Sequence, residues 1–209
     1  PLFDRRAVRF DYTLSQGTGC TLETVITLDR REVARLSHNA SGRTGSFAVP
    51  LDSADTLIQC DFFEELCWTP ERPRLFDVLF TVKREGETLD RVRSYFGMRK
   101  VSVEDGVFLL NNRPYYQKLV LDQGYWPDSL LTAPDDEAFI RDIQLIKQMG
   151  FNGVRKHQKV EDPRFLYHAD RMGLLVWGEI GSAYVYSPNA ACRLYREWQE
   201  AVLRDINHP

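Results

Sequence analysis

The chain has 209 residues, of which 43% are hydrophobic and 27% are charged, and its formal net charge at pH 7 is -3. This length allows one large domain or two small ones, and the apolar content is sufficient for ordinary hydrophobic cores. The lack of a basic excess argues against nucleic acid or an anionic membrane as a partner. No apolar run reaches the roughly 18–20 residues that a membrane span needs.

The first residues, Pro1 to Arg6, contain neither an initiator methionine nor the apolar core of a signal peptide. We interpret them as an internal start, so the localisation of the parent protein is not predicted. The cysteines form no Cys-x-x-Cys pair and have no histidine cluster beside them, so we expect no zinc site and no cofactor. They are Cys20, Cys60, Cys67 and Cys192.

The first half of the chain carries short alternating runs that are typical of β-strands. They cover residues 23–28, 45–51, 56–60, 75–82 and 91–96. Strands roughly every 10–15 residues, separated by Gly, Pro, Asn and Asp, predict an immunoglobulin-like β-sandwich of about seven antiparallel strands. We place this domain at residues 1–98. It lacks the Cys…Trp…Cys pattern of an antibody domain.

Residues 96–103 lead out of the sandwich, and a hairpin is expected over 107–114. Its turn is Asn111-Asn112, because asparagine tolerates the positive φ angles of tight hairpin turns.

From Tyr115 onward, short apolar strands alternate with amphipathic helices. The first helix opens at Pro134-Asp-Asp-Glu137, buries one apolar face and closes at Gly150. That face comprises Phe139, Ile143, Ile146 and Met149. The expected strands are 115–121, 153–155 and 174–177, and the later helices are 163–172, closed by Gly173, and about 191–206.

Strand–helix alternation with short loops predicts parallel strands and right-handed crossovers. A complete eight-fold α/β barrel takes roughly 250 residues. We therefore expect residues 99–209 to form the first part of a (β/α)8 TIM barrel, and the whole chain to be an internal fragment of a longer protein.

Three motifs carry a resemblance to a known family. They are the runs Met149–His157 and Asp170–Glu179 and the triplet Asn207-His-Pro209. Together they resemble glycoside hydrolase family 2, which includes β-galactosidases, β-glucuronidases and β-mannosidases. The resemblance implies hydrolysis of terminal β-O-glycosidic bonds with retention, and a carbohydrate β-glycoside as the partner. It leaves the oligomeric state open.

In this family an Asn-Glu pair that carries the acid/base follows shortly after the Asn-His-Pro triplet. Here the triplet is residues 207–209. The resemblance therefore implies that both catalytic glutamates lie downstream. We predict no catalytic residue within the chain, and we expect the fragment itself to be inactive.

In an α/β barrel the active site gathers at the carboxyl ends of the strands. Five residues near these ends are our candidates for substrate binding: Asp122, Arg155, His157, Trp177 and Glu179. Carboxylates and a guanidinium bind sugar hydroxyls, and an indole packs against the apolar face of a sugar ring. Tyr125 and Trp126 either stack on sugar in the same way or pack under their loop.

The resemblance gives some of these residues a role. Asn152-Gly-Val-Arg155 matches the family's Asn-x-x-Arg pattern, whose arginine lies beneath the nucleophile region and orients carboxylates. His157 stands one position before the family's usual histidine. Asp122 lies where β-galactosidases carry a Gly-x-Asn-x-His pattern, which is absent here, so galactosidase specificity is in doubt.

Glu179 aligns with a carboxylate that binds magnesium in some β-galactosidases. Gly181 stands in the place of the second ligand, a histidine. We therefore expect no metal. Each candidate also has a structural alternative: a salt bridge for Arg155, a surface loop for His157, a turn cap for Asp122 and core packing for Trp177.

Two other functions stay open. A non-catalytic carbohydrate-binding or assembly module, based on the sandwich, would expose a row of aromatic side chains on one sheet face. Only Phe62, Phe63 and Trp68 are grouped in this way, and core packing explains them more simply. The other alternative is a barrel hydrolase of a sister family that uses the same two-carboxylate chemistry.

Overall fold

The computed structural model describes residues 1–15, 19–51, 63–182, 185, 187–206 and 208. These form two compact units, the first spanning Pro1–Tyr115 and the second Tyr116–His208. The boundary that the sequence predicts after residue 98 stays a prediction. No helix in the described ranges is long and apolar enough to cross a membrane.

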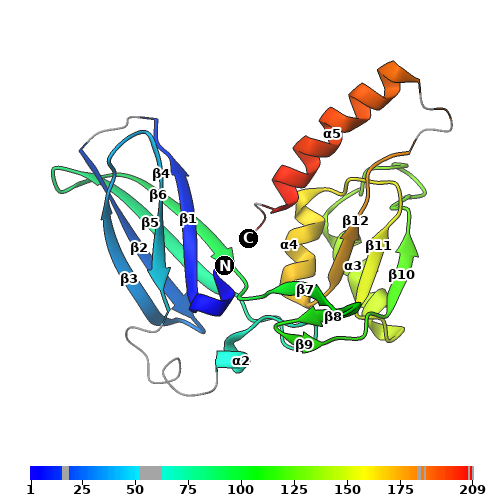
Figure 1. The fold of residues 1–209 in the computed structure, drawn as a ribbon, viewed down its shortest axis with the longest axis horizontal. Helices are drawn as coiled ribbons and strands as arrows, with labels where there is room; N and C mark the ends of the chain where they lie inside the picture. The colour runs from blue at the N-terminus through cyan, green and yellow to red at the C-terminus, as the bar shows by residue number, and fades with distance from the viewer. Residues whose placement is uncertain (16–18, 52–62, 183–184, 186, 207, 209) are drawn as a thin grey trace. The chain divides into compact units, whose positions relative to one another are not determined.

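Two antiparallel sheets build most of the first unit (Figure 1). One has the strand order β3-β2-β5-β6, and the other pairs β1 with β4. The bounds are η1 Phe3–Arg5, β1 Ala7–Thr13, β2 Cys20–Leu28, β3 Arg31–Asn39, β4 Thr44–Pro50, α2 Phe63–Leu66, β5 Phe76–Arg84 and β6 Glu87–Phe96. The predicted sandwich is confirmed, whereas the strand predicted at 56–60 lies outside the described residues.

Alternation along the central strand β2 creates the core of this unit. Every second side chain of β2 is buried, from Cys20 to Leu28. All of them except Thr24 pack in one cluster with Phe76 and Phe96, whose rings stack at 4.9 Å. The sequence analysis did not predict β1 and β3, because charged residues interrupt the apolar alternation of both strands.

Of the three aromatic residues that the sequence groups before the strongest strand, the two that the structure describes are not exposed. Phe63 and Trp68 are 7% and 2% exposed, and both are buried. Phe62 lies outside the described residues. Core packing is therefore the role of the two that are described.

A three-stranded sheet follows the sandwich strands. It consists of β7 Val101–Glu104, β8 Val107–Leu110 and β9 Arg113–Pro114. Asn111 and Asn112 have φ angles of 55° and 63°, so the predicted hairpin turn is confirmed. The Asn111 side chain also accepts from the Lys100 amide at 3.0 Å and donates to the Trp68 carbonyl at 3.0 Å.

The second unit is a parallel sheet with helices on one face (Figure 1). Its strands run in the order β10-β11-β12, and α3 and α4 cover one side. The bounds are β10 Leu119–Asp122, α3 Asp136–Gln148, β11 Gly153–Lys156, α4 Pro163–Met172, β12 Leu175–Gly178 and α5 Pro188–Ile206. The predicted strand–helix alternation is confirmed.

The helices begin and end where the sequence provides caps. The Asp135 carboxylate accepts from the Ala138 amide at 2.8 Å and opens α3. Gly173 ends α4 with a φ of 75°, which glycine adopts without strain. The placement of Met149 on the buried face was wrong, because it follows the last helical residue and is 62% exposed.

Asn152 and Gly153 fix how closely the three strands approach at their amino ends. The Asn152 side chain accepts from the Lys118 amide at 2.7 Å and donates to the Tyr116 carbonyl at 2.9 Å. Gly153 sits between Leu119 and Leu175 in the strand register. A Cβ added at Gly153 would clash with Leu119 Cδ2 and lie 2.9 Å from both Leu175 Cβ and its carbonyl oxygen.

We expect Gly153→Ala to lower the free energy of unfolding by about 1–3 kcal/mol, because the extra methyl overfills a packed sheet. Gly178→Ala in β12 is the matched control, since its added Cβ would meet only Asp205 Oδ2 at 3.7 Å. Gly178→Ala should change the free energy of unfolding by no more than about 0.5 kcal/mol. Denaturant unfolding of both variants checks this, and equal effects would contradict it.

Candidate functional site

The strand register separates the residues at the carboxyl ends onto two faces of the sheet. Leu121, Arg155 and Trp177 are aligned side by side on the face opposite α3 and α4. Leu121 is 52% exposed and Trp177 is 51% exposed. In the next row, the side chains of Asp122 and Lys156 point to the helix side, because successive strand residues alternate in direction.

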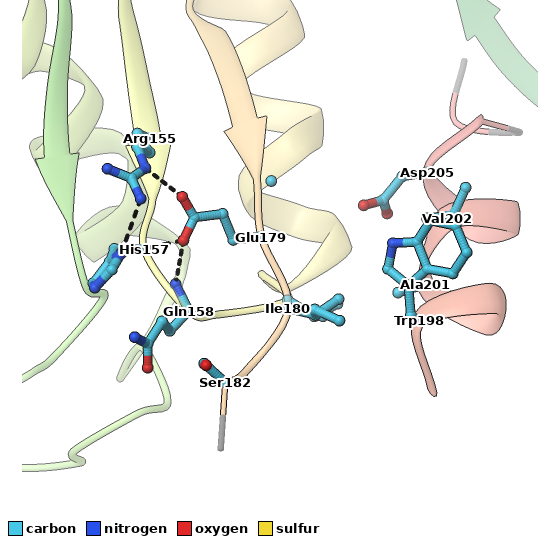
Figure 2. A pocket seen from close by; sticks show the side chains of 12 residues that line it. Arg155, His157, Gln158, Glu179, Ile180, Ser182, Trp198, Ala201, Val202 and Asp205 are labelled. Atoms are coloured by element: carbon cyan, nitrogen blue, oxygen red, sulfur yellow. Dashed lines mark hydrogen bonds and ion pairs between the residues drawn. The ribbon is translucent and has the colours of Figure 1, made fainter. Parts of the chain in front are cut away.

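Three of the predicted site residues come together beyond these ends, as Figure 2 shows. Arg155 Nε donates to Glu179 Oε1 in an ion pair. His157 Nδ1 lies 3.1 Å from Glu179 Oε2 and 3.4 Å from an Arg155 guanidinium nitrogen. The sequence named all three residues as candidates, although it did not indicate that Glu179 would contact both Arg155 and His157.

The backbone supplies a further donor to Glu179. The Gln158 amide donates to Oε2 at 2.9 Å. Gln158 has a φ of 55°, a left-handed conformation that is uncommon for residues other than glycine. This conformation follows directly after His157, so the chain turns sharply where the cluster forms. Such backbone conformations concentrate at functional sites.

The surroundings of Glu179 keep it ionised. The Arg155 guanidinium first, and the Gln158 amide second, hold the pKa of Glu179 below its usual value. A general acid needs a raised pKa instead. The arrangement therefore suits a fixed negative charge that orients Arg155 and His157, and it does not suit proton donation.

The same contacts decide how well the residues fit a magnesium ion. Both Glu179 oxygens already accept from protein donors, and Gly181 offers no side-chain ligand. Arg155, a cation, stands against the carboxylate where a metal would have to bind. The residues present do not fit magnesium.

A cavity of about 470 Å³ adjoins the cluster. Arg155, His157 and Glu179 line one side of it, and Trp198 and Asp205 of α5 line the other (Figure 2). Trp198 lies within the last predicted helix, about 191–206, but the sequence gave no sign that it would border this cavity.

Asp122 takes a different position from the other candidates. Its carboxylate pairs with Lys156, whose side chain is completely buried on the helix side of β11. The sugar contact predicted for Asp122 stays a prediction. Its structural alternative, a turn cap, is supported by the Gly124 amide, which donates to Asp122 Oδ1 at 2.6 Å. Trp177 stays a candidate on the Arg155 face.

The two aromatic residues after β10, Tyr125 and Trp126, differ in their exposure. Tyr125 is 64% exposed. The Trp126 ring packs edge-on against Phe139 at 6.1 Å, in the core beneath the loop. Packing is therefore the role of Trp126, and only Tyr125 is exposed for stacking.

Sequence reasoning missed Lys156, Lys159 and Glu161. Each lies within or just after β11, and the Glu161 carboxylate pairs with both lysines. A signal was available, because a lysine in a strand buried on both faces is costly unless a carboxylate is near. The expected strand ended at Arg155, which left Lys156 in a loop.

Asp142 on α3 offers a pH test of this charged region. Burial, and then the nearby Asp122 charge, raise the pKa of Asp142. A carboxyl whose folded pKa is raised contributes stability below its unfolded pKa, and that stability is lost as pH rises through the folded pKa. Asp142→Asn should therefore stabilise the protein at pH 7, with a gain that shrinks towards pH 4.

Thermal unfolding of Asp142→Asn and its parent between pH 4 and pH 8 measures this gain. Asp128→Asn, at an exposed loop position of the same unit, is the control. A gain that is constant across the pH range would contradict the assignment.

Comparison with known families and proteins agrees with the fold described above. Residues 4–99 match the model of glycosyl hydrolases family 2, and residues 101–209 match the model of the TIM barrel domain of that family. A protein named beta-galactosidase from Photobacterium profundum is 32% identical over 152 residues, which are 68% of this chain and 15% of that protein. Beta-galactosidase BoGH2A from Bacteroides ovatus is 31% identical over 158 residues, 68% of this chain and 18% of that protein.

Solved structures share the fold. A Bifidobacterium dentium beta-glucuronidase complexed with coumarin-3-O-glucuronide has a TM-score of 0.77 at 23% identity, covering 97% of this chain and 32% of that one. A Parabacteroides merdae beta-glucuronidase has a TM-score of 0.75 at 17% identity, covering 97% and 25%. The chain thus spans a minor part of each relative, a β-sandwich and the start of a barrel. With both family models matched in order along its length, the chain belongs to glycosyl hydrolases family 2.

Proposed function

We propose that the protein containing this chain hydrolyses terminal β-O-glycosidic bonds with retention of configuration. The observation that carries the proposal is the cluster of Arg155, His157 and Glu179 at the carboxyl ends of parallel strands. Family membership supports it, as do the relatives named beta-galactosidase and the structural neighbours named beta-glucuronidase. The substrate class is therefore a carbohydrate β-glycoside.

Within this function Arg155 is proposed to orient carboxylates. Its fixed fork of donors holds a carboxylate in one geometry, and Glu179 already uses one branch. A second guanidinium nitrogen lies 3.4 Å from His157 Nδ1, and the side chain as a whole remains 43% exposed. Trp177 on the same face of the sheet supplies an apolar surface for a sugar ring, and His157 supplies a polar edge.

The chemical step is proposed to use carboxyl groups outside these 209 residues. Retention by double displacement needs a nucleophile and an acid/base about 5–5.5 Å apart. Glu179 is held ionised by Arg155, so it does not serve as the acid. We further propose that residues 1–98 form the sandwich domain and residues 99–209 the start of the catalytic barrel.

The whole protein should release p-nitrophenol from at least one of the β-galactoside, β-glucuronide and β-mannoside. Arg155→Met should lower kcat/KM on that substrate roughly 100-fold, because misplaced reacting groups lose about that much. Arg171→Met is the matched control, since Arg171 lies on α4 and contacts Tyr167 outside the cluster. Proton NMR of the first anomer formed tests retention. No hydrolysis of any β-glycoside, or inversion, would refute the proposal.

The 209-residue polypeptide alone should bind sugar at most weakly and should show no hydrolysis above background. The reason is that the two-carboxylate machinery is proposed to lie elsewhere in the protein. The same p-nitrophenyl panel, run at high polypeptide concentration, measures this. Turnover that survives purification and is abolished by Glu179→Gln would place a catalytic carboxyl within the chain.

A further inference from the structure

A buried network of charges lies behind the candidate site, on the helix side of β11. Lys156 is completely buried, and its ammonium pairs with Asp122 and with Glu161 Oε2 at 2.9 Å. The same ammonium lies 3.9 Å from the centre of the Phe165 ring of α4. Two carboxylates and an aromatic face therefore offset the cost of burying this charge.

The network continues into the loops that follow β10 and β11. Lys159 pairs with Glu161 Oε1 at 3.1 Å and donates to the Gly124 carbonyl at 3.0 Å. The Gly124 amide donates to Asp122 Oδ1 at 2.6 Å. The contacts thus form a closed circuit that joins the loop after β10 to the loop after β11.

Gly124 shows how tightly the two loops are joined. Its φ is +65°, and an added Cβ would lie 2.5 Å from Lys159 Nζ and 3.1 Å from Glu161 Oε2. A larger residue would have to displace the Lys159 side chain and adopt a backbone conformation that residues other than glycine rarely adopt. The side chains of Lys159 and Glu161 are 13% and 5% exposed, so water has little access to the circuit.

The circuit and the candidate site share one short stretch of backbone. Arg155 and His157 flank Lys156, and the His157 amide donates to the Asp122 carbonyl at 2.8 Å. A movement of Lys156 would therefore move both residues that hold Glu179.

We propose that Lys156, Glu161 and Asp122 are positioning residues, which lock the loops after β10 and β11 so that Arg155 and His157 hold Glu179 in place. None of the three needs to touch substrate. The role in catalysis rests on the proposed glycosidase function, whereas the locking of the loops does not.

The test compares Lys156→Met and Glu161→Gln with the parent in the whole protein. Methionine keeps an unbranched apolar chain without the charge, and glutamine keeps the shape of Glu161 and its acceptor for the Asp162 amide. Lys147→Met is the matched control. Lys147 donates to the Met172 and Gly173 carbonyls at the end of α4, so its loss lowers the melting temperature without touching the circuit.

The first readout is amide hydrogen exchange in peptides covering residues 122–126 and 156–162. We expect Lys156→Met to speed exchange in both segments at least about tenfold, Glu161→Gln to do so to a smaller extent, and Lys147→Met to leave both unchanged. Parental exchange in either folded circuit variant overturns the locking role. If Lys156→Met does not fold, the exchange rates of Glu161→Gln alone decide whether the circuit locks the loops.

The second readout is kinetics on the best p-nitrophenyl β-glycoside. We expect kcat to fall roughly 100-fold in Lys156→Met with a much smaller change in KM, because orientation is lost more than binding. Faster exchange with a parental kcat overturns the catalytic positioning role. If the parent hydrolyses no glycoside, the proposed function fails, and hydrogen exchange still decides whether the circuit locks the loops.

Discussion

The arrangement of the second unit depends on one constraint in the central strand β11. Neighbouring strand residues point to opposite faces, so the adjacent cations Arg155 and Lys156 lie on opposite sides of the sheet. Each cation needs a carboxylate on its own side. Glu179 meets Arg155 beyond β12, and Asp122 and Glu161 meet Lys156 among the helices. The loops at this end of the sheet are ordered around these two sets of ion pairs.

The two sets differ in their surroundings and therefore in their roles. Arg155 is partly exposed and Lys156 is completely buried. Breaking a buried pair by removing one partner is strongly destabilising, because the remaining charge is left without compensation. The exposed pair contributes little to stability but keeps a guanidinium and an ionised carboxylate in a defined geometry. Adjacent residues of one strand thus differ in what they contribute to stability, because the Lys156 pairs are buried and the Arg155 pair is partly exposed.

The sequence predicted those parts of the fold that local patterns determine. The bounds of α4 followed from Pro163 and Gly173, and the hairpin turn followed from Asn111 and Asn112. The strands β1 and β3 were missed because their solvent-facing charges obscure the period of two. The circuit around Lys156 could not be derived, because Asp122 and Glu161 are far apart in the chain and meet only through the pairing of β10 with β11.

Asn152 and Gly153 carry a chemical consequence beyond packing. Asparagine followed by glycine is the dipeptide most prone to spontaneous deamidation, because glycine leaves the backbone nitrogen free to attack the side chain. In the folded protein, hydrogen bonds to Lys118 and Tyr116 hold the Asn152 amide in place. Once the unit unfolds, that protection is lost, and the aspartate formed cannot donate to the Tyr116 carbonyl. Time spent unfolded should therefore produce molecules that cannot re-form this link between the strand ends, so the unfolding of this unit should become less reversible the longer it stays unfolded.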